Sequence, residues 1–199
     1  TGGGGGVMAE VARGFCDTPQ RRGLSVGVIR GETAPCAERG DEGLCHRPAR
    51  VNEWVELPIH THLPHSGARG REMLSRNHIN VLSADALIAL PGGPGTCAEV
   101  TLRIDYGRAV ILWLGNGTID GRAAEYFETR APHDGQVKVA RLLSDIPGCI
   151  EDCIGFTPWR RRAAVPGPGG AASVFDPLAK RFDWPRMAGE RVLVIGIGG

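Results

Sequence analysis

Two glycine-rich segments have the composition of phosphate-binding loops. The first lies directly before Val7 and the second directly before Cys97, and each is expected to begin a helix. Without Cβ atoms the backbone can approach a phosphate, and the free amides of the following helix point towards it. We therefore expect one anionic ligand between the segments, bound by Gly2, Gly3, Gly5, Gly6, Gly92, Gly93, Gly95 and Thr96. The alternative is a pair of tight turns that hold no ligand.

Other nucleotide-binding and catalytic motifs are missing from the sequence. No Gly-Lys-Ser/Thr follows either glycine segment, which disfavours Walker A chemistry. A strand-preceded GxGxxG with its later acidic residue and a GxSxG elbow are also absent. The formal net charge is only +1, so no global field favours nucleic acid or a membrane surface. The expected partner is a small phosphorylated ligand, with no nucleic acid and no membrane.

The hydrophobic pattern predicts the elements that position these segments. Apolar or β-branched runs bounded by glycine or proline are typical of strands, and helical spacing is typical of helices. Strands are expected at residues 24–29, 54–59, 85–90 and 109–114. Helices are expected at residues 7–13, 72–83, 96–106, 122–129 and 137–153, the last broken at Pro147, and residues 31–50 are expected to form a loop. The alternation predicts a Rossmann-like parallel α/β sheet with helices on both faces.

A change of composition divides the chain. Residues 1–158 are expected to form a Rossmann-like domain that binds a nucleotide or phosphate, and residues 159–185, rich in proline and glycine, a linker. Residues 186–199 end in an apolar run followed by glycines, which is typical of the start of a second α/β domain. The alternative is that this tail docks into the sheet of the first domain as a strand.

Three strings resemble one protein superfamily. Thr1–Met8 reads TGGGGGVM, Ser75–Ala86 reads SRNHINVLSADA, and Pro91–Glu99 reads PGGPGTCAE. They look like the superfamily of Lonely-guy proteins and molybdenum cofactor carriers, over about residues 1–155. Asn77 stands where the Lonely-guy branch has lysine, and that branch opens GGGxxGLM, so the chain resembles the carrier branch more closely. The family pattern places a strand and a helix before the first glycine segment, which implies an N-terminally truncated domain.

The resemblance implies two different functions. The carrier branch binds the molybdenum cofactor, a phosphorylated pterin, or a nucleotide-like ligand, and Asn77 is then a further ligand-binding residue. The Lonely-guy branch implies a phosphoribohydrolase that cleaves the N-glycosidic bond of cytokinin nucleoside 5′-monophosphates, with Arg76 and Glu99 as catalytic residues. In such chemistry a carboxylate stabilises the ribosyl cation while an arginine holds an anionic group. We expect a binding protein, with the hydrolase as the alternative, and no further cofactor is required.

The same residues could instead have structural roles that involve no ligand. Glu99 could be a first-turn helix carboxylate that forms a capping box with Thr96. Arg76 could form a surface ion pair with Glu72 or Asp85. Asparagine is a poor helix former, so Asn residues at positions 77 and 80 indicate contacts with a ligand or with the backbone.

No metal site is expected. His60, His62 and His65 lie in one run, but no carboxylate lies close in sequence to complete a zinc site, so a lid or loop near the ligand is expected instead. Cys97 is expected to be a small buried filler, with a reactive thiolate as the alternative.

The protein is expected to be a cytoplasmic homo-oligomer. Its six cysteines show no paired CxxC spacing, which favours a reducing compartment. Apolar positions around Met73–Val81 and Val100–Ile104 exceed what one sheet face needs, and together with the resemblance they indicate self-association.

Overall fold

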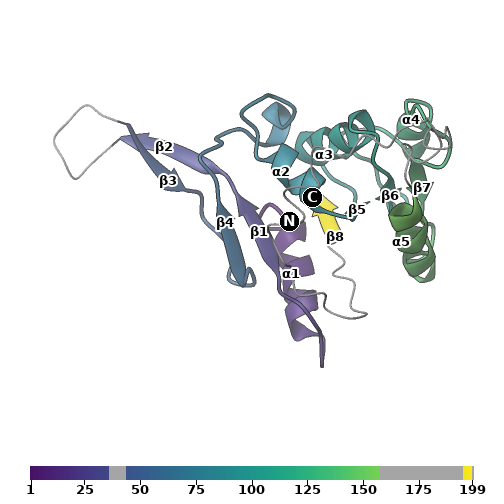
Figure 1. Ribbon diagram of the computed structural model, residues 1–199, viewed down its shortest axis with the longest axis horizontal. Helices are drawn as coiled ribbons and strands as arrows, with labels where there is room; N and C mark the ends of the chain where they lie inside the picture. The colour runs from purple at the N-terminus through teal and green to yellow at the C-terminus, as the bar shows by residue number, and fades with distance from the viewer. Residues whose placement is uncertain (36–43, 157–194, 199) are drawn as a thin grey trace, which may run out of the picture.

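The computed structural model describes residues 1–35, 44–156 and 195–198 (Figure 1). The helices are α1 (Val7–Asp17), α2 (Asn77–Ser83), α3 (Pro94–Asp105), α4 (Ala124–Glu128) and α5 (Ile146–Gly155), with short 3-10 helices η1 (Gly67–Arg69) and η2 (Leu143–Asp145). The strands are β1 (Val26–Ile29), β2 (Gly31–Pro35), β3 (Leu44–Pro48), β4 (Leu57–His60), β5 (Ala86–Ala89), β6 (Val110–Leu112), β7 (Val137–Val139) and β8 (Ile195–Gly198).

The strands form two parallel sheets and one hairpin. The larger sheet has the order β7-β6-β5-β8, and its neighbouring strands all run parallel. β1 and β4 form a second parallel pair, in which Val28 lies opposite Ile59. β2 and β3 form an antiparallel hairpin that projects from the rest of the protein in Figure 1. Parallel strands that alternate with helices confirm the predicted Rossmann-like α/β fold.

Helices cover both faces of the larger sheet. Successive residues of a strand point to opposite faces, so Leu87 and Ile88 of β5 enter two different cores. The core on one face includes Val100 of α3, and the core on the other face includes Cys153 of α5. Complete burial of a Leu or Ile side chain contributes about 1.5–3 kcal/mol. The two cores therefore fix β5, and with it the glycine segment that follows this strand.

Several predicted elements differ from the structure, and the helix expected at 72–83 begins only at Asn77. Residues 31–50, expected to be a loop, contain the β2–β3 hairpin. The strand predicted at 54–59 begins only at Leu57, because the Trp54 N–H bonds to Asn52 Oδ1 in a turn. The helix predicted at 137–153 is β7, η2 and α5, since β-branched Val137 and its neighbours pair with β6. Pro147 lies in the first turn of α5 instead of breaking a helix, because no helical hydrogen bond is lost there.

The tail contributes a strand to the larger sheet. β8 runs parallel to β5, with Gly196 opposite Leu87 and Gly198 opposite Ala89, and it lies near α1, α2 and α3. This is the second of the two arrangements considered for residues 186–199. The expected linker at 159–185 lies outside the described residues, so the division into two domains stays a prediction. Among the described residues, no helix combines the length and apolar character that a membrane span requires.

Candidate functional site

The first glycine segment follows a fixed path into α1. Thr1 lies beside β1, where its carbonyl accepts a hydrogen bond from a strand amide at 2.9 Å. Asn52 donates its backbone N–H to the Gly3 carbonyl at 2.9 Å and its Nδ2 to the Gly4 carbonyl at 2.8 Å. Gly3 and Gly6 have φ values of 68° and 62°, a conformation that favours glycine. β1 and Asn52 together hold this segment in place.

The second glycine segment begins α3. Gly93 is the N-cap residue, and no side chain caps the helix, so its first amides are available to a ligand. Gly92 donates its N–H to the Thr118 carbonyl at 3.1 Å and accepts the Asp120 N–H at 2.7 Å. Thr96 packs so closely on Gly92 that a Cβ at position 92 would overlap its hydroxyl. The loop after β6 therefore holds this segment from one side.

Glu99 and Thr96 do not form the capping box considered above. Because the N-cap is Gly93, Glu99 lies beyond the first turn, and α3 has no acidic residue in that turn. Both side chains are buried, with 5 % of Glu99 and 1 % of Thr96 exposed. The helix-cap interpretation of Glu99 is therefore wrong.

Arg76, Asn80 and Glu99 form a buried charged cluster. Arg76 Nη1 lies 3.5 Å from Glu99 Oε1, and Asn80 Nδ2 donates to the same oxygen at 2.9 Å. α2 supplies Asn80, the residue before α2 is Arg76, and α3 supplies Glu99. Arg76 is only 7 % exposed, so it is not the surface residue that the alternative requires. The structure thus brings together the two residues expected to be catalytic, and their catalytic roles stay a prediction.

Arg76 also joins the two glycine segments. A Cβ on Gly2 would overlap Arg76 Nη2, so the backbone of the first segment lies directly on the guanidinium group. Glu99, the ion-pair partner of Arg76, belongs to the helix that the second segment begins. The two segments, far apart in the sequence, therefore meet at one arginine. This arrangement would allow a single ligand to contact both segments.

Burial shifts the pKa of both charged groups. Loss of water raises the pKa of Glu99 above its usual value, and Arg76 and Asn80 oppose this rise. Loss of water also lowers the pKa of Arg76, and Glu99 opposes that change. Arginine stays protonated in proteins, so Glu99 is the group in this cluster that exchanges a proton.

Several polar atoms near this cluster have no hydrogen-bond partner. Among the described residues, the buried atoms of this kind include Arg76 Nε and Nη1, Asn77 Oδ1 and Thr96 Oγ1. An unsatisfied buried polar atom costs about 1–3 kcal/mol. The guanidinium can only donate hydrogen bonds, whereas the amide oxygen and the hydroxyl can accept them. A polar ligand with both donors and acceptors would satisfy this set.

The remaining predicted glycines leave space or allow close packing. Gly5, Gly6 and Gly93 have open space where a Cβ atom would project. A Cβ on Gly95 would lie 3.4 Å from the Cα of Gly67 in η1, which is close to an ordinary van der Waals contact. The glycines at the two helix starts thus leave room for a ligand.

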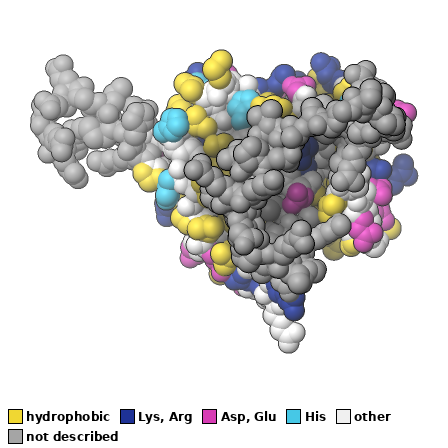
Figure 2. All heavy atoms as spheres, viewed as in Figure 1, with side chains coloured by type: hydrophobic (Ala, Val, Ile, Leu, Met, Phe, Trp, Pro, Cys, Tyr) yellow, Lys and Arg dark blue, Asp and Glu magenta, His cyan; other side chains and the backbone are white. Residues whose placement is uncertain are grey.

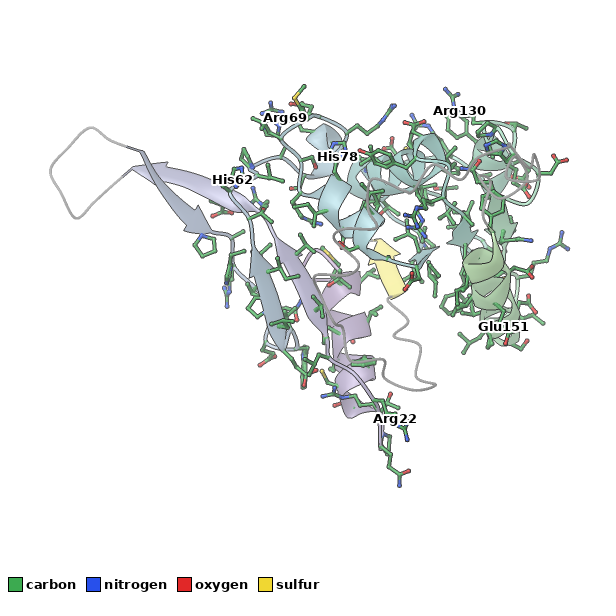
Figure 3. All side chains as sticks on the ribbon, viewed as in Figure 1. Arg22, His62, Arg69, His78, Arg130 and Glu151 are labelled. Carbon is green, nitrogen blue, oxygen red and sulfur yellow. The ribbon has the colours of Figure 1, made fainter. Side chains whose placement is uncertain are left out.

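The histidines do not join the cluster. Figure 3 shows His62 near the base of the hairpin, well separated from His78 in α2. Figure 2 shows histidine side chains spread over this part of the surface, among hydrophobic ones. In the part of the chain that the structure describes, no group of three or more His, Cys, Asp or Glu side chains could hold a metal ion. A lid formed by residues 60–65 stays a prediction.

Two residues near the glycine segments were not expected from the sequence. Asn52 holds the first segment across a separation of 48 residues. Arg122 donates Nη1 to the Cys97 sulfur at 3.7 Å, across 25 residues. No local motif marks either residue, because each contact depends on the fold.

A family model matches the part of the chain that contains these residues. The match covers residues 1–141 and is to the SLOG cluster4 family. It includes both glycine segments and the Arg76–Glu99 ion pair. No curated protein and no solved structure matches the chain. Because the family match extends over more than half of the sequence, the chain belongs to the SLOG cluster4 family.

Proposed function

We propose that the protein binds a phosphate-bearing, nucleotide-like ligand at Arg76, in the manner of molybdenum cofactor carriers. The observation that carries the proposal is the position of Arg76, which contacts Gly2 of one glycine segment and Glu99 of the helix after the other. Family membership supports a nucleotide-related role in general. The ligand is the molybdenum cofactor or a nucleoside monophosphate, and no further cofactor is required.

Each part of the site contributes one kind of contact. The open backbone at Gly5, Gly6 and Gly93 lets phosphate oxygens reach the amides at the starts of α1 and α3. Arg76 supplies a buried positive charge, and its Nε and Nη1 have no hydrogen-bond partner among the described residues. Asn77 Oδ1 accepts a hydrogen bond from the organic part of the ligand. This donor and acceptor pattern favours a phosphorylated heterocycle over inorganic phosphate alone.

A second candidate function is supported by Glu99. Its carboxylate is buried and bonded to Asn80, and burial raises its pKa. In its ionised form, which Arg76 and Asn80 favour, this carboxylate would stabilise a ribosyl cation while water adds to C1′, the N-glycosidic bond breaks and the proton of that water passes to the departing base. The products of a nucleoside 5′-monophosphate would be the free base and ribose 5-phosphate. This is the phosphoribohydrolase of cytokinin-activating type.

One experiment separates the two functions. The protein is titrated calorimetrically with a panel of nucleoside monophosphates, and the same mixtures are analysed for free base and ribose 5-phosphate. Binding without release of base supports the carrier function. Turnover that Glu99→Gln abolishes supports the hydrolase, with Glu151→Gln as the control because Figure 3 shows Glu151 on α5, far from α2. If no phosphorylated ligand binds, both proposals are wrong.

We also propose that the protein is cytoplasmic and that it self-associates. The described cysteines Cys16, Cys97, Cys149 and Cys153 are all free thiols, which supports a reducing compartment. Large apolar side chains on and before α2 are exposed, as a contact between copies requires.

A further inference from the structure

α4 and its flanks carry two arginines stacked on one tyrosine. Arg122 precedes α4 (Ala124–Glu128) and Arg130 follows it, and both side chains reach the ring of Tyr126 in this helix. The guanidinium carbons of Arg122 and Arg130 lie 5.2 and 4.8 Å from the centroid of the Tyr126 ring. Tyr126 is 36 % exposed and Arg130 is exposed as well. We call these three residues the α4 cluster.

The α4 cluster has positive charge available for a ligand. Arg122 forms an ion pair with Asp120, but among the described residues no carboxylate lies within ion-pair distance of Arg130. Glu125 and Glu128 also belong to α4. At about 100° per residue, both lie at least a quarter turn from Tyr126 around the helix, so neither is on the side of α4 that carries the tyrosine ring. Arg130 therefore keeps a solvent-facing cation beside an exposed aromatic ring.

Arg122 connects the α4 cluster to the start of α3, which the second glycine segment begins. Arg122 Nη1 donates to the sulfur of Cys97 in the N-terminal part of α3 at 3.7 Å. The loop that leads to Arg122 is bonded to Gly92 through Thr118 and Asp120. Figure 3 shows Arg130 beyond α4, with its side chain directed outward. A ligand held at the start of α3 and long enough to follow this loop would reach the two arginines.

We infer that the α4 cluster binds a second anionic group of the ligand whose first phosphate lies at the glycine segments. The inference rests on the proposed function, and among phosphate-bearing, nucleotide-like ligands it favours molecules with two phosphate groups over those with one, such as a nucleoside monophosphate. Guanidinium groups donate charge-assisted hydrogen bonds to phosphate oxygens, and stacking on Tyr126 keeps these long side chains ordered before the ligand arrives. The organic part of the ligand would lie between the two anion sites.

The test compares AMP with ADP and with adenosine 3′,5′-bisphosphate by calorimetry. These probes share the base and differ in the number and spacing of their phosphate groups. We expect at least one two-phosphate probe to bind about tenfold more tightly than AMP, as one charge-assisted contact provides. Arg130→Gln should reduce this advantage to about twofold or less. Arg13→Gln is the control, because Arg13 is exposed and pairs with Glu10 on α1.

The outcomes distinguish this inference from the function on which it rests. Equal binding of all three probes by the unmodified protein overturns the inference and leaves the proposed function intact. The same holds if the tenfold advantage survives Arg130→Gln. If no probe binds, the proposed function fails and the inference fails with it. Loss of the advantage in Arg13→Gln would show a general charge effect and would also overturn the α4 cluster as the site.

Discussion

Gly2 controls the position of the guanidinium group on which the proposed site depends. A Cβ at this position would overlap Arg76 Nη2, so Gly2→Ala must push the guanidinium away from Glu99. The side-chain end can move, so we expect a small change in stability but about a tenfold or greater loss of AMP affinity. Calorimetry and thermal unfolding measure the two effects. The control is Gly14→Ala in α1, where an added Cβ meets nothing within 4 Å.

Protonation of Glu99 links stability to pH. Burial raises the pKa of Glu99 in the folded state. At pH values between the pKa of the unfolded state and that of the folded state, Glu99 is therefore protonated more fully in the folded protein than in the unfolded chain. The stability from this group is therefore present at acidic pH and is lost as the pH rises through the folded pKa. We expect Glu99→Gln to remove this part of the pH dependence, measured by urea unfolding between pH 4 and pH 8 with wild type alongside. Parallel pH profiles of the two proteins would contradict the prediction.

At the scale of elements, Arg103 joins α2, β5 and β6 from inside the protein. This arginine is buried, and its guanidinium donates to the carbonyls of Val81 at 2.5 Å, Ala84 at 2.7 Å and Ala109 at 2.8 Å. Burial lowers the pKa of Arg103 to about 10, so it stays charged at neutral pH. Arg103→Met leaves these carbonyls unsatisfied and should lower the free energy of unfolding by about 3 kcal/mol or more.

Chemical denaturation checks the role of Arg103. Arg71→Met is the matched control, because Arg71 is exposed and its ion pair with Asp105 is at the surface. An exposed pair contributes about 0–1 kcal/mol, so this variant should unfold close to wild type. Equal midpoints for the two variants would show that Arg103 does not hold the elements together.

The sequence predicts the elements around the site better than those elsewhere. β5 and α3 were expected close to their observed positions, because an apolar run ends at a glycine segment and helical spacing follows. The pairing of Arg76 with Glu99 could not be derived from spacing, since it depends on how α2 packs on α3. Val137–Val139 was expected to be helical, because a short strand has too few residues for its period to stand out. The same limit applies to the β2–β3 hairpin, whose residues do not alternate between apolar and polar types.

At the scale of the whole molecule, exposed apolar residues limit where copies could meet. Val100 and Ile104 are buried in the core, so α3 cannot supply the contact that the sequence analysis expected from it. Met73 is 90 % exposed and Ile79 of α2 is 38 % exposed. We expect wild type to sediment as a dimer or larger species, and Met73→Glu with Ile79→Glu to sediment as a monomer. Leu142→Glu, at another exposed leucine, should leave the assembly intact.

The sedimentation result can contradict self-association in two ways. A wild-type protein that is monomeric at high concentration would show that the surface before and along α2 is not an interface. Dissociation by Leu142→Glu would place the contact near η2 instead.

The tail, residues 186–199, supplies one strand of the larger sheet. β8 is the outermost strand of this sheet and pairs with β5 along its whole length, from Ala86 to Ala89. A free edge at β5 would expose unpaired backbone groups next to the glycine segment. Deletion of residues 186–199 should therefore lower the midpoint of thermal unfolding by roughly 5–10 °C, which corresponds to about 2–3 kcal/mol for a chain of this size.

A point substitution separates strand pairing from the mere presence of the tail. Ile197 lies opposite Ile88 in the β5–β8 register. Ile197→Pro removes an N–H and restricts the backbone, so it should reproduce most of the loss seen on deletion if β8 is a strand of this sheet. Ile197→Thr keeps the N–H and a β-branched side chain, and it should unfold within a few degrees of wild type. If both substitutions and the deletion leave the midpoint unchanged, the tail contributes nothing to the sheet and its role as the start of a second α/β domain is favoured.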